Sequence, residues 1–294
     1  MTAAQPMASF GGGAVAYLIC VLLHFLSEPV RWRIVFGGER LRPYLHVYFL
    51  TALMSYLLPA KLGLPLRVLM LNRRLGVPLG AVSAGLVVDA LVSYSSWLLA
   101  GGLAGIAVLG RMPAEWRYGF LLGGGALVLG GGLLMAVRRR WRRIGDGVRA
   151  SWWNGAIWAR IGRRGAAVLL LAVAIDIASH AGRHLALATL LGLDVPPGDL
   201  AVLAVFAVFA GIASFMPMGL GGYDVTLAAG LIGLGAPPDA AATMVLANRV
   251  GTLVVSAVLG LWSAHALGFE LRGLRDRVGR LLGAGRDTEE RSGS

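Results

Sequence analysis

Two segments far apart in the sequence carry the same pattern of helix-breaking residues inside apolar surroundings. The first reads Leu-Pro-Ala-Lys-Leu-Gly-Leu-Pro at 58–65, and the second reads Met-Pro-Met-Gly-Leu-Gly-Gly-Tyr at 216–223. Both contain Pro-x-x-Leu-Gly, and both are followed by a Leu-Gly-x-Pro turn, at 75–78 and 234–237. Pro and Gly interrupt helices and free backbone groups that lipid cannot satisfy. Matching interruptions in two halves of a membrane protein predict a substrate site between two structural repeats.

The composition is that of an integral membrane protein. Of the 294 residues, 57% are hydrophobic and 14% are charged, and the mean hydropathy is +0.71; globular chains carry about 25% charged residues. The net charge of +12 does not indicate a nucleic-acid partner, because the Arg residues lie in short loops between apolar segments, where they set orientation. Cys20 is the single cysteine, and the sequence has no Cys-x-x-Cys metal motif, so we expect no disulfide, metal or cofactor.

The distribution of Arg predicts how the chain is threaded. We expect about five full spans, and two hairpins that enter and leave the membrane on the same side. The predicted full spans are 10–26, an uncleaved first span, and 81–109, 118–137, 166–192 and 239–267. The predicted hairpins are 44–72 and 199–235, and ordinary helices kinked at proline are the alternative. With this threading one face holds 21 Arg and the other holds two, so the Arg-rich face is predicted to be cytoplasmic.

The predicted fold class is therefore an all-α polytopic membrane protein with inverted repeats and two re-entrant helical hairpins. One transmembrane domain is predicted over 1–268, with repeat one at about 10–109 and repeat two at about 166–267. The N-terminus is expected outside and the C-terminus inside the cytoplasm. Residues 269–294 are predicted to form a basic amphipathic tail with a disordered end, and the Trp- and Arg-rich loop 138–165 is predicted to lie at lipid headgroups.

Ionisable residues inside the apolar segments are the strongest functional pointers, because a charge at the centre of a membrane helix costs about 2.5–3.5 kcal/mol. Four of them on one segment are spaced i, i+4, i+7 and i+8, so they share one helix face that must look inward. Internal ion pairs, Asp176 with Arg183 or Asp224 with Arg249, are the alternative to a binding role. The full set is Lys61, Arg67 and Asp89 in the first half, and Asp176, His180, Arg183, His184, Asp224 and Arg249 in the second.

The cations in this set outnumber the carboxylates by four to three when His is neutral. A surplus of Arg suits an anionic group, since the guanidinium fork grips phosphate, and broken-helix ends add backbone N–H donors. The implied ligand is a phosphate headgroup whose tails stay in lipid. The predicted binding residues are Arg249, Arg183, Asp224, Lys61, Arg67, Asp176 and His180. The predicted hinge residues are Pro59, Gly63, Pro65, Pro217, Gly219, Gly221 and Gly222.

Signatures of catalysis are absent from the sequence. His180 and His184 are four residues apart, but the Glu of a His-Glu-x-x-His zinc peptidase is missing, and no nucleophile elbow or phosphate-binding loop occurs. We therefore expect no enzymatic activity. An intramembrane transferase or phosphatase that uses Asp176, His180 and Asp224 is the open alternative.

The two broken segments resemble the motifs of the lysylphosphatidylglycerol synthase transmembrane-region family, over roughly residues 10–268. The family's first motif, Leu-Pro-x-Arg-Leu-Gly-Glu-x-x-Arg, is matched at 58–67 with Lys61 in place of Arg and Leu64 in place of Glu. Its second motif, Pro-Gly-Gly-Leu-Gly-x-x-Glu, is matched at 217–224 with Met218 and Asp224 as the departures. The family's late Arg is matched by Arg249. The missing Glu at Leu64 argues against proton coupling through an acid in each hairpin.

The resemblance implies a flippase-like protein that moves polar lipids between leaflets of a bacterial inner membrane, without the soluble aminoacyl-transfer domain that some members add. The expected partner is an anionic membrane lipid, with an envelope-lipid synthase or glycosyltransferase as a further candidate. A lipid-modifying enzyme and a non-transporting partner of such a synthase remain the alternatives.

Overall fold

The computed structural model describes residues 7–38, 40–57, 63–108, 156–213 and 221–268. Within these ranges the chain forms eight helices and no strand. Several predictions lie outside the described residues: the predicted span 118–137, the tail 269–294, and the residues Pro59, Lys61, Pro217 and Gly219.

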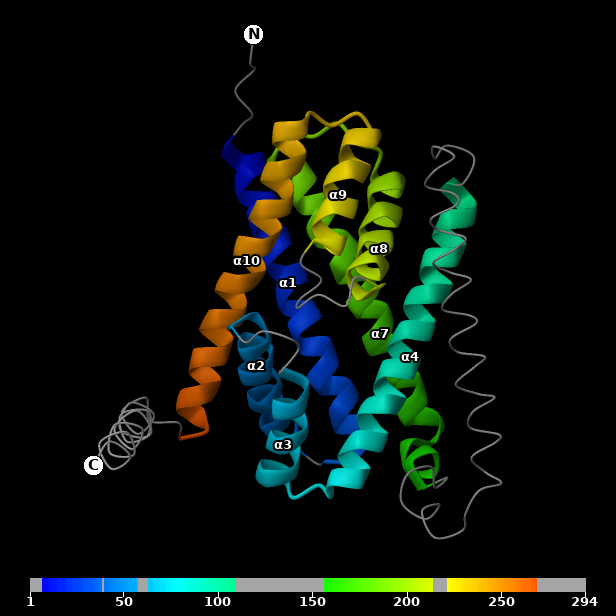
Figure 1. Ribbon diagram of the computed structural model, residues 1–294, viewed down its shortest axis with the longest axis vertical. Helices are drawn as coiled ribbons and strands as arrows, with labels where there is room; N and C mark the ends of the chain where they lie inside the picture. The colour runs from blue at the N-terminus through cyan, green and yellow to red at the C-terminus, as the bar shows by residue number, and fades with distance from the viewer. Residues whose placement is uncertain (1–6, 39, 58–62, 109–155, 214–220, 269–294) are drawn as a thin grey trace, which may run out of the picture.

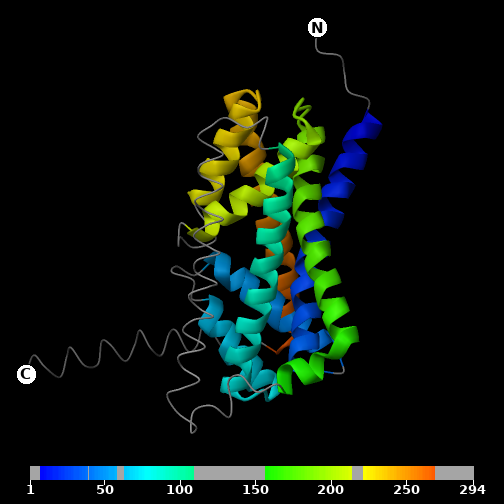
Figure 2. The same ribbon diagram turned by 90° about the vertical axis from the view of Figure 1, so that its right-hand side faces the viewer.

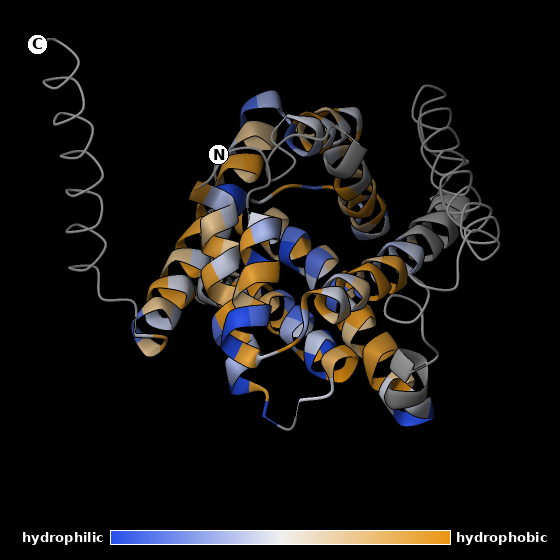
Figure 3. Cartoon of the chain, turned by 60° about the horizontal axis from the view of Figure 1, so that its bottom comes forward, coloured by the Kyte–Doolittle hydropathy of each residue, from blue (hydrophilic) through white to orange (hydrophobic). Residues whose placement is uncertain are grey.

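Four long helices carry apolar stretches that are long enough to cross a membrane: α1 (Met7–Phe36), α4 (Leu79–Val108), α7 (Ala156–Leu190) and α10 (Pro238–Ala266). Their outward faces are apolar: Leu171 on α7 is 59% exposed and Val258 on α10 is 63% exposed. Figure 3 shows hydrophobic residues, coloured orange, recurring along the long helices. Large exposed aliphatic side chains are suited to contact with lipid, so the described chain is a multi-pass membrane protein.

Four shorter helices form two pairs at opposite ends of the molecule. Helices α2 (Arg42–Leu57) and α3 (Gly63–Leu75) lie in the lower half, and α8 (Pro197–Ala213) and α9 (Gly222–Gly233) lie in the upper half (Figures 1 and 2). Each pair is closely packed through a glycine. A Cβ added to Gly63 would overlap with Ser55 on α2, and one added to Gly230 would overlap with Leu203 on α8.

The two Leu-Gly-x-Pro segments form matching turns between helices, as the sequence predicted. Gly76 is the first residue after α3 and has φ 65°, and Gly235 is the second residue after α9 and has φ 95°. Both conformations favour glycine, which has no Cβ to clash. Pro78 and Pro237 then precede α4 and α10, and their carbonyls accept bonds from Val82 and Ala241 at 2.9 Å.

Two helix boundaries differ from the sequence-based prediction. The first span was predicted to end at residue 26, with a loop before the hairpin at 44, but α1 continues through Pro29 to Phe36. Helix α7 begins at Ala156, ten residues before the predicted span, and is kinked at Gly162, where φ is 57°. In α1 the charged residues Glu28 and Arg31 hid the helix, because their partners Arg67 and Asp89 lie far away in the sequence.

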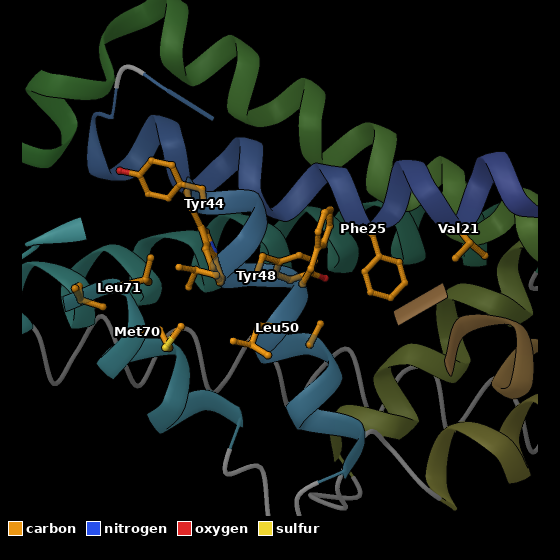
Figure 4. Close-up of a cluster of buried hydrophobic side chains, with 12 residues drawn as sticks. Val21, Phe25, Tyr44, Tyr48, Leu50, Met70 and Leu71 are labelled. Atoms are coloured by element: carbon orange, nitrogen blue, oxygen red, sulfur yellow. The ribbon is translucent and has the colours of Figure 1, made fainter. Parts of the chain in front are cut away.

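The apolar core is divided between the two halves. In the first half, side chains from α1, α2 and α3 pack together around Tyr48 and the fully buried Trp32 and Leu71 (Figure 4). In the second half, α7, α8, α9 and α10 enclose Leu200, Leu227 and Met244. Helices α1 and α7, which pack along one another more extensively than any other described pair, run through both halves. The polar residues considered next lie on and around these two helices.

Candidate functional site

One face of α7 carries the polar side chains that the sequence predicted would look inward, and this prediction is confirmed. Asp176, His180, Arg183 and His184 are all buried, with exposed fractions between 0% and 6%. Their spacing places them along one stripe of the helix. The stripe meets two groups of polar residues, which we call the α1 cluster and the α9 cluster.

The α1 cluster is held together by a guanidinium between two carboxylates. Arg31 Nε donates to Asp89 Oδ1 on α4 at 2.7 Å, and Arg31 Nη1 lies 3.5 Å from Asp176 Oδ2 on α7. Trp32 Nε1 also donates to Asp89, at 3.3 Å. Buried charges of this kind persist only when they are paired and hydrogen-bonded. The cluster consists of His24, Glu28, Arg31, Arg67, Asp89 and Asp176.

Two further ion pairs complete the α1 cluster. His24 Nδ1 lies 2.6 Å from Asp176 Oδ1, and Arg67 Nη1 donates to Glu28 Oε1 at 2.6 Å. The Arg67 guanidinium also lies over the Trp32 ring, 4.7 Å from its centroid. Arg67 is therefore bound by a carboxylate and an aromatic face, an arrangement that suits a planar guanidinium.

The α9 cluster is centred on the Tyr223 hydroxyl. His184 Nδ1 donates to the His180 carbonyl at 2.6 Å, so its Nε2 accepts from Tyr223, also at 2.6 Å. The Tyr223 oxygen in turn accepts from Asn248 Nδ2 at 3.2 Å. This chain of bonds fixes His184 as the neutral tautomer protonated at Nδ1. The cluster consists of His180, Arg183, His184, Tyr223, Asp224, Asn248 and Arg249.

Arg249 and Asp224 form a forked ion pair at the edge of the α9 cluster. Arg249 Nε and Nη2 donate to the two Asp224 oxygens at 2.7 and 3.0 Å. Asp224 also accepts from the Gly221 amide at 3.2 Å, and it stands in the first turn of α9, where a carboxylate is favoured. One of the two ion pairs considered from the sequence is thus present. The other is not, because Asp176 pairs with His24 and Arg31 instead of Arg183.

Arg183 differs from the other buried cations of the site in its surroundings. It is 5% exposed, yet no carboxylate lies within ion-pair distance of it in the part of the chain that the structure describes. Its Nη2 donates to His180 Nε2 at 3.3 Å, and its buried Nε has no hydrogen-bond partner. An uncompensated buried cation is costly, so such a group indicates a site for an anion.

His180 joins the two clusters. Its ring lies 6.0 Å from the His24 ring on one side and 5.0 Å from the His184 ring on the other, measured between centroids. Because Nε2 accepts from Arg183, Nδ1 carries the proton, and this buried atom has no partner either. The polar residues consequently form a continuous path between the two halves of the molecule.

The remaining predicted residues lie at helix starts. Gly63 and Gly222 are the first residues of α3 and α9, and Pro65 stands in the first turn of α3, where the missing N–H is tolerated. Gly221 precedes α9 with φ 87°, a conformation that requires glycine. These four positions agree with the predicted breaks in the helices.

The sequence-based prediction missed three members of the α1 cluster. His24 lies inside the predicted span 10–26 and was overlooked there, whereas Glu28 and Arg31 lie beyond its predicted end. The three occur at i, i+4 and i+7, a helical spacing that would have grouped them if the first span had been extended past residue 26. Asp89 and Arg67 were found but without their partners. Among the described residues, no group of three or more His, Cys, Asp and Glu side chains could hold a metal ion.

Comparison with known proteins gives one family. No curated protein and no solved structure matches the chain significantly. A family model described as the lysylphosphatidylglycerol synthase TM region matches residues 2–260, which is most of the chain. Together with the membrane-spanning helices and the broken-helix motifs, this match shows that the chain belongs to the lysylphosphatidylglycerol synthase transmembrane-region family.

Proposed function

We propose that this protein is a polar-lipid transporter of the flippase type, which moves an anionic, phosphate-bearing headgroup between the leaflets of a bacterial inner membrane. The observation that carries the proposal is Arg183, a buried cation without a carboxylate partner among the described residues, in the middle of an apolar helix. A phosphate would supply the missing charge and accept from Arg183 Nε, which has no partner.

The other predicted residues take roles around Arg183. Arg249, which lies 5.1 Å above the Tyr223 ring, would exchange its Asp224 partner for the phosphate, leaving Asp224 to bind an amine on the headgroup. Asp176 and His180 would help to position the headgroup from α7. Arg67 would guide the headgroup from the cytoplasmic side, and we assign the same role to Lys61 from its position in the sequence.

Inverted repeats and re-entrant hairpins form part of the proposal. Two features support them: the α2–α3 and α8–α9 pairs occupy opposite halves (Figure 1), and corresponding positions carry similar residues. Gly63 and Gly221 each follow the break proline by four residues, and Asp89 and Asn248 each follow the turn proline by eleven. Asp89 and Asn248 are both buried in the polar path. We place the substrate site between these two repeats.

The proposed orientation puts the lower end in the cytoplasm. Arg40 and Arg42 stand just before and at the start of α2, and Arg73 and Arg74 stand in the last turn of α3, and both helix ends lie at the lower end in Figure 1. At the upper end Asp194 lies between α7 and α8 and Asp239 lies in the first turn of α10, and the connections 191–196 and 234–237 hold no Arg. Single cysteines at 40, 73, 194 and 239 in a Cys20→Ser background test this with a membrane-impermeant maleimide. We expect labelling in intact cells at 194 and 239 only. Opposite sides for 40 and 73 would refute the first re-entrant hairpin.

Transport itself is tested in liposomes that contain the purified protein and a headgroup-labelled phosphatidylglycerol, with an impermeant quencher outside. Protein-dependent loss of the protected inner pool is expected. Arg183→Gln should slow it about tenfold or more, since bonds to charged groups contribute about 1.5–3 kcal/mol. Arg163→Gln removes the same charge from an exposed site on the same helix and is the control.

The same liposomes separate the proposed function from its alternatives. Chromatography of the lipids after incubation should return them unchanged, because we propose that the chain has no catalytic residue. A new lipid species would favour the intramembrane enzyme. Equal transport rates for wild type and Arg183→Gln would contradict the proposed site. Absence of transport, together with copurification of a lipid synthase, would favour the non-transporting partner.

A further inference from the structure

The carboxylates of the α1 cluster outnumber its guanidinium groups by one. Within the described residues it holds three carboxylates, on Glu28, Asp89 and Asp176, and two guanidinium groups, on Arg31 and Arg67. With a neutral imidazole on His24 the cluster carries a net charge of −1, and with an imidazolium it is neutral. A low-dielectric interior favours the neutral state, so one bound proton completes the cluster.

His24 is the group placed to take that proton. Its Nδ1 is engaged by Asp176 at 2.6 Å, which leaves Nε2 as the nitrogen whose lone pair accepts the proton. In the described part of the chain Nε2 makes no hydrogen bond. The His24 side chain is 30% exposed, more than any other member of the cluster, whereas the Asp176 side chain is 9% exposed. A proton can therefore reach the imidazole, and the imidazolium that forms lies directly against the buried Asp176 carboxylate.

We propose that the His24–Asp176 pair is a proton-binding site, and that the proton gradient across the membrane drives transport through it. The coupling part of this inference rests on the proposed transport function, whereas the proton site does not. The three carboxylates of the α1 cluster stand on the long helices α1, α4 and α7. Loss of the family's Glu at Leu64 consequently leaves this site intact.

Charged and titratable groups on five helices lie around the pair and the α1 cluster. Helix α1 itself supplies Glu28 and Arg31, and α10 meets α1 through Asn248, which does not titrate. The groups on the other elements are Asp89 and Tyr94 on α4, His180 and Arg183 on α7, Tyr48 on α2 and Arg67 on α3. The charge count given above includes all of their carboxylates and guanidinium groups except Arg183, which belongs to the α9 cluster.

The proton site communicates with Arg183 through one side chain. The His180 ring packs edge-on against His24 at 6.0 Å, and its Nε2 accepts from Arg183 at 3.3 Å. An imidazolium at His24 adds a positive charge next to the anion site, so a proton and an anionic headgroup should bind cooperatively. Reciprocity then requires that the headgroup also favours proton binding at His24.

Proton binding is measured directly by nitrogen NMR of histidine-labelled protein in phosphatidylcholine nanodiscs between pH 5 and 8. One imidazole should exchange between neutral and charged forms as the pH changes, and its signal should be missing from the spectrum of His24→Gln. In Asp176→Asn the remaining carboxylates and guanidinium groups already balance, so His24 should stay neutral throughout. A titrating His24 supports the site, and a His24 signal without any charge change would overturn it, whether or not lipid is moved.

Coupling is measured in liposomes by imposing a pH difference and following labelled phosphatidylglycerol. Wild type should move lipid at least about fivefold faster with the gradient than without it. His24→Gln, which keeps the site polar, should still move lipid but at a rate that the gradient does not change. A wild-type transport rate that is the same with and without the gradient would overturn the coupling but not the proton site. Absence of wild-type transport, with a titrating His24, would overturn the proposed function and leave the proton site standing.

Discussion

Arg31 Nε donates to Asp89 Oδ1 at 2.7 Å, with both side chains more than nine-tenths buried, and this bond ties α1 to α4. The same guanidinium reaches Asp176 on α7 at 3.5 Å. One cation thus connects α1 with α4 and α7, through partners that are 58 and 145 residues away along the chain. In an apolar surrounding, removal of this cation leaves Asp89 without a cationic partner, bonded to Trp32, and leaves Asp176 with His24.

Replacing Arg31 by Gln should therefore destabilise the protein strongly, by about 3–5 kcal/mol, as expected when one partner of a buried ion pair is removed. Thermal unfolding of detergent-purified protein, followed by size-exclusion chromatography, measures the loss. Arg73→Gln, an exposed change of equal charge, should unfold at the wild-type temperature. The double variant Arg31→Gln/Asp89→Asn restores the wild-type net charge and should recover part of the loss; a double variant no better than Arg31→Gln would contradict the pairing.

Tyr223→Phe removes the hydroxyl that serves both His184 and Asn248. Two buried polar atoms lose their partner, which costs about 1–3 kcal/mol. The unfolding midpoint in a denaturant series should fall by the corresponding amount. Tyr94→Phe is the matched control, because Tyr94 is 47% exposed. Equal midpoints for Tyr223→Phe and wild type would show that the hydroxyl does not organise the α9 cluster.

Gly221→Ala places a side chain at φ 87°, where residues with a Cβ are strained by about 1–3 kcal/mol. We expect a lower thermal midpoint and a weakened start of α9, since the Gly221 amide donates to Asp224. Gly198→Ala, in the open first turn of α8, should have no comparable effect. Unchanged stability of Gly221→Ala would mean that this backbone conformation is not required.

Gly230→Ala tests the close approach of α9 to α8. The added methyl would overlap with Leu203, and overpacking of this kind typically costs about 1–3 kcal/mol. Gly233→Ala lies one turn further along α9 in open space and should be neutral or slightly stabilising. Thermal midpoints of the pair check the prediction, and equal values for the two variants would argue against tight packing at Gly230.

Much of the architecture could be predicted from the sequence because lipid restricts what an apolar segment can do. A segment in lipid must satisfy its own backbone and is therefore helical, and clusters of Pro and Gly interrupt it, so the turns at Gly76 and Gly235 and the start of α9 at Gly222 were predictable. The inward stripe of α7 followed from spacing alone. The prediction was wrong at 27–36, where Glu28, Pro29 and Arg31 resemble a loop. There the helix continues because Arg67 and Asp89 neutralise the charges.

The sequence by itself determined the class of protein, the helix ends at the Pro- and Gly-marked breaks and the face of α7 that turns away from lipid, because these depend on residues that are close along the chain. The tertiary structure alone decided the partners. Asp176 is seven residues from Arg183 but pairs with His24 and Arg31, 152 and 145 residues away. Which helices lie side by side determines where a buried charge finds its counterion, and spacing within one helix does not contain that information.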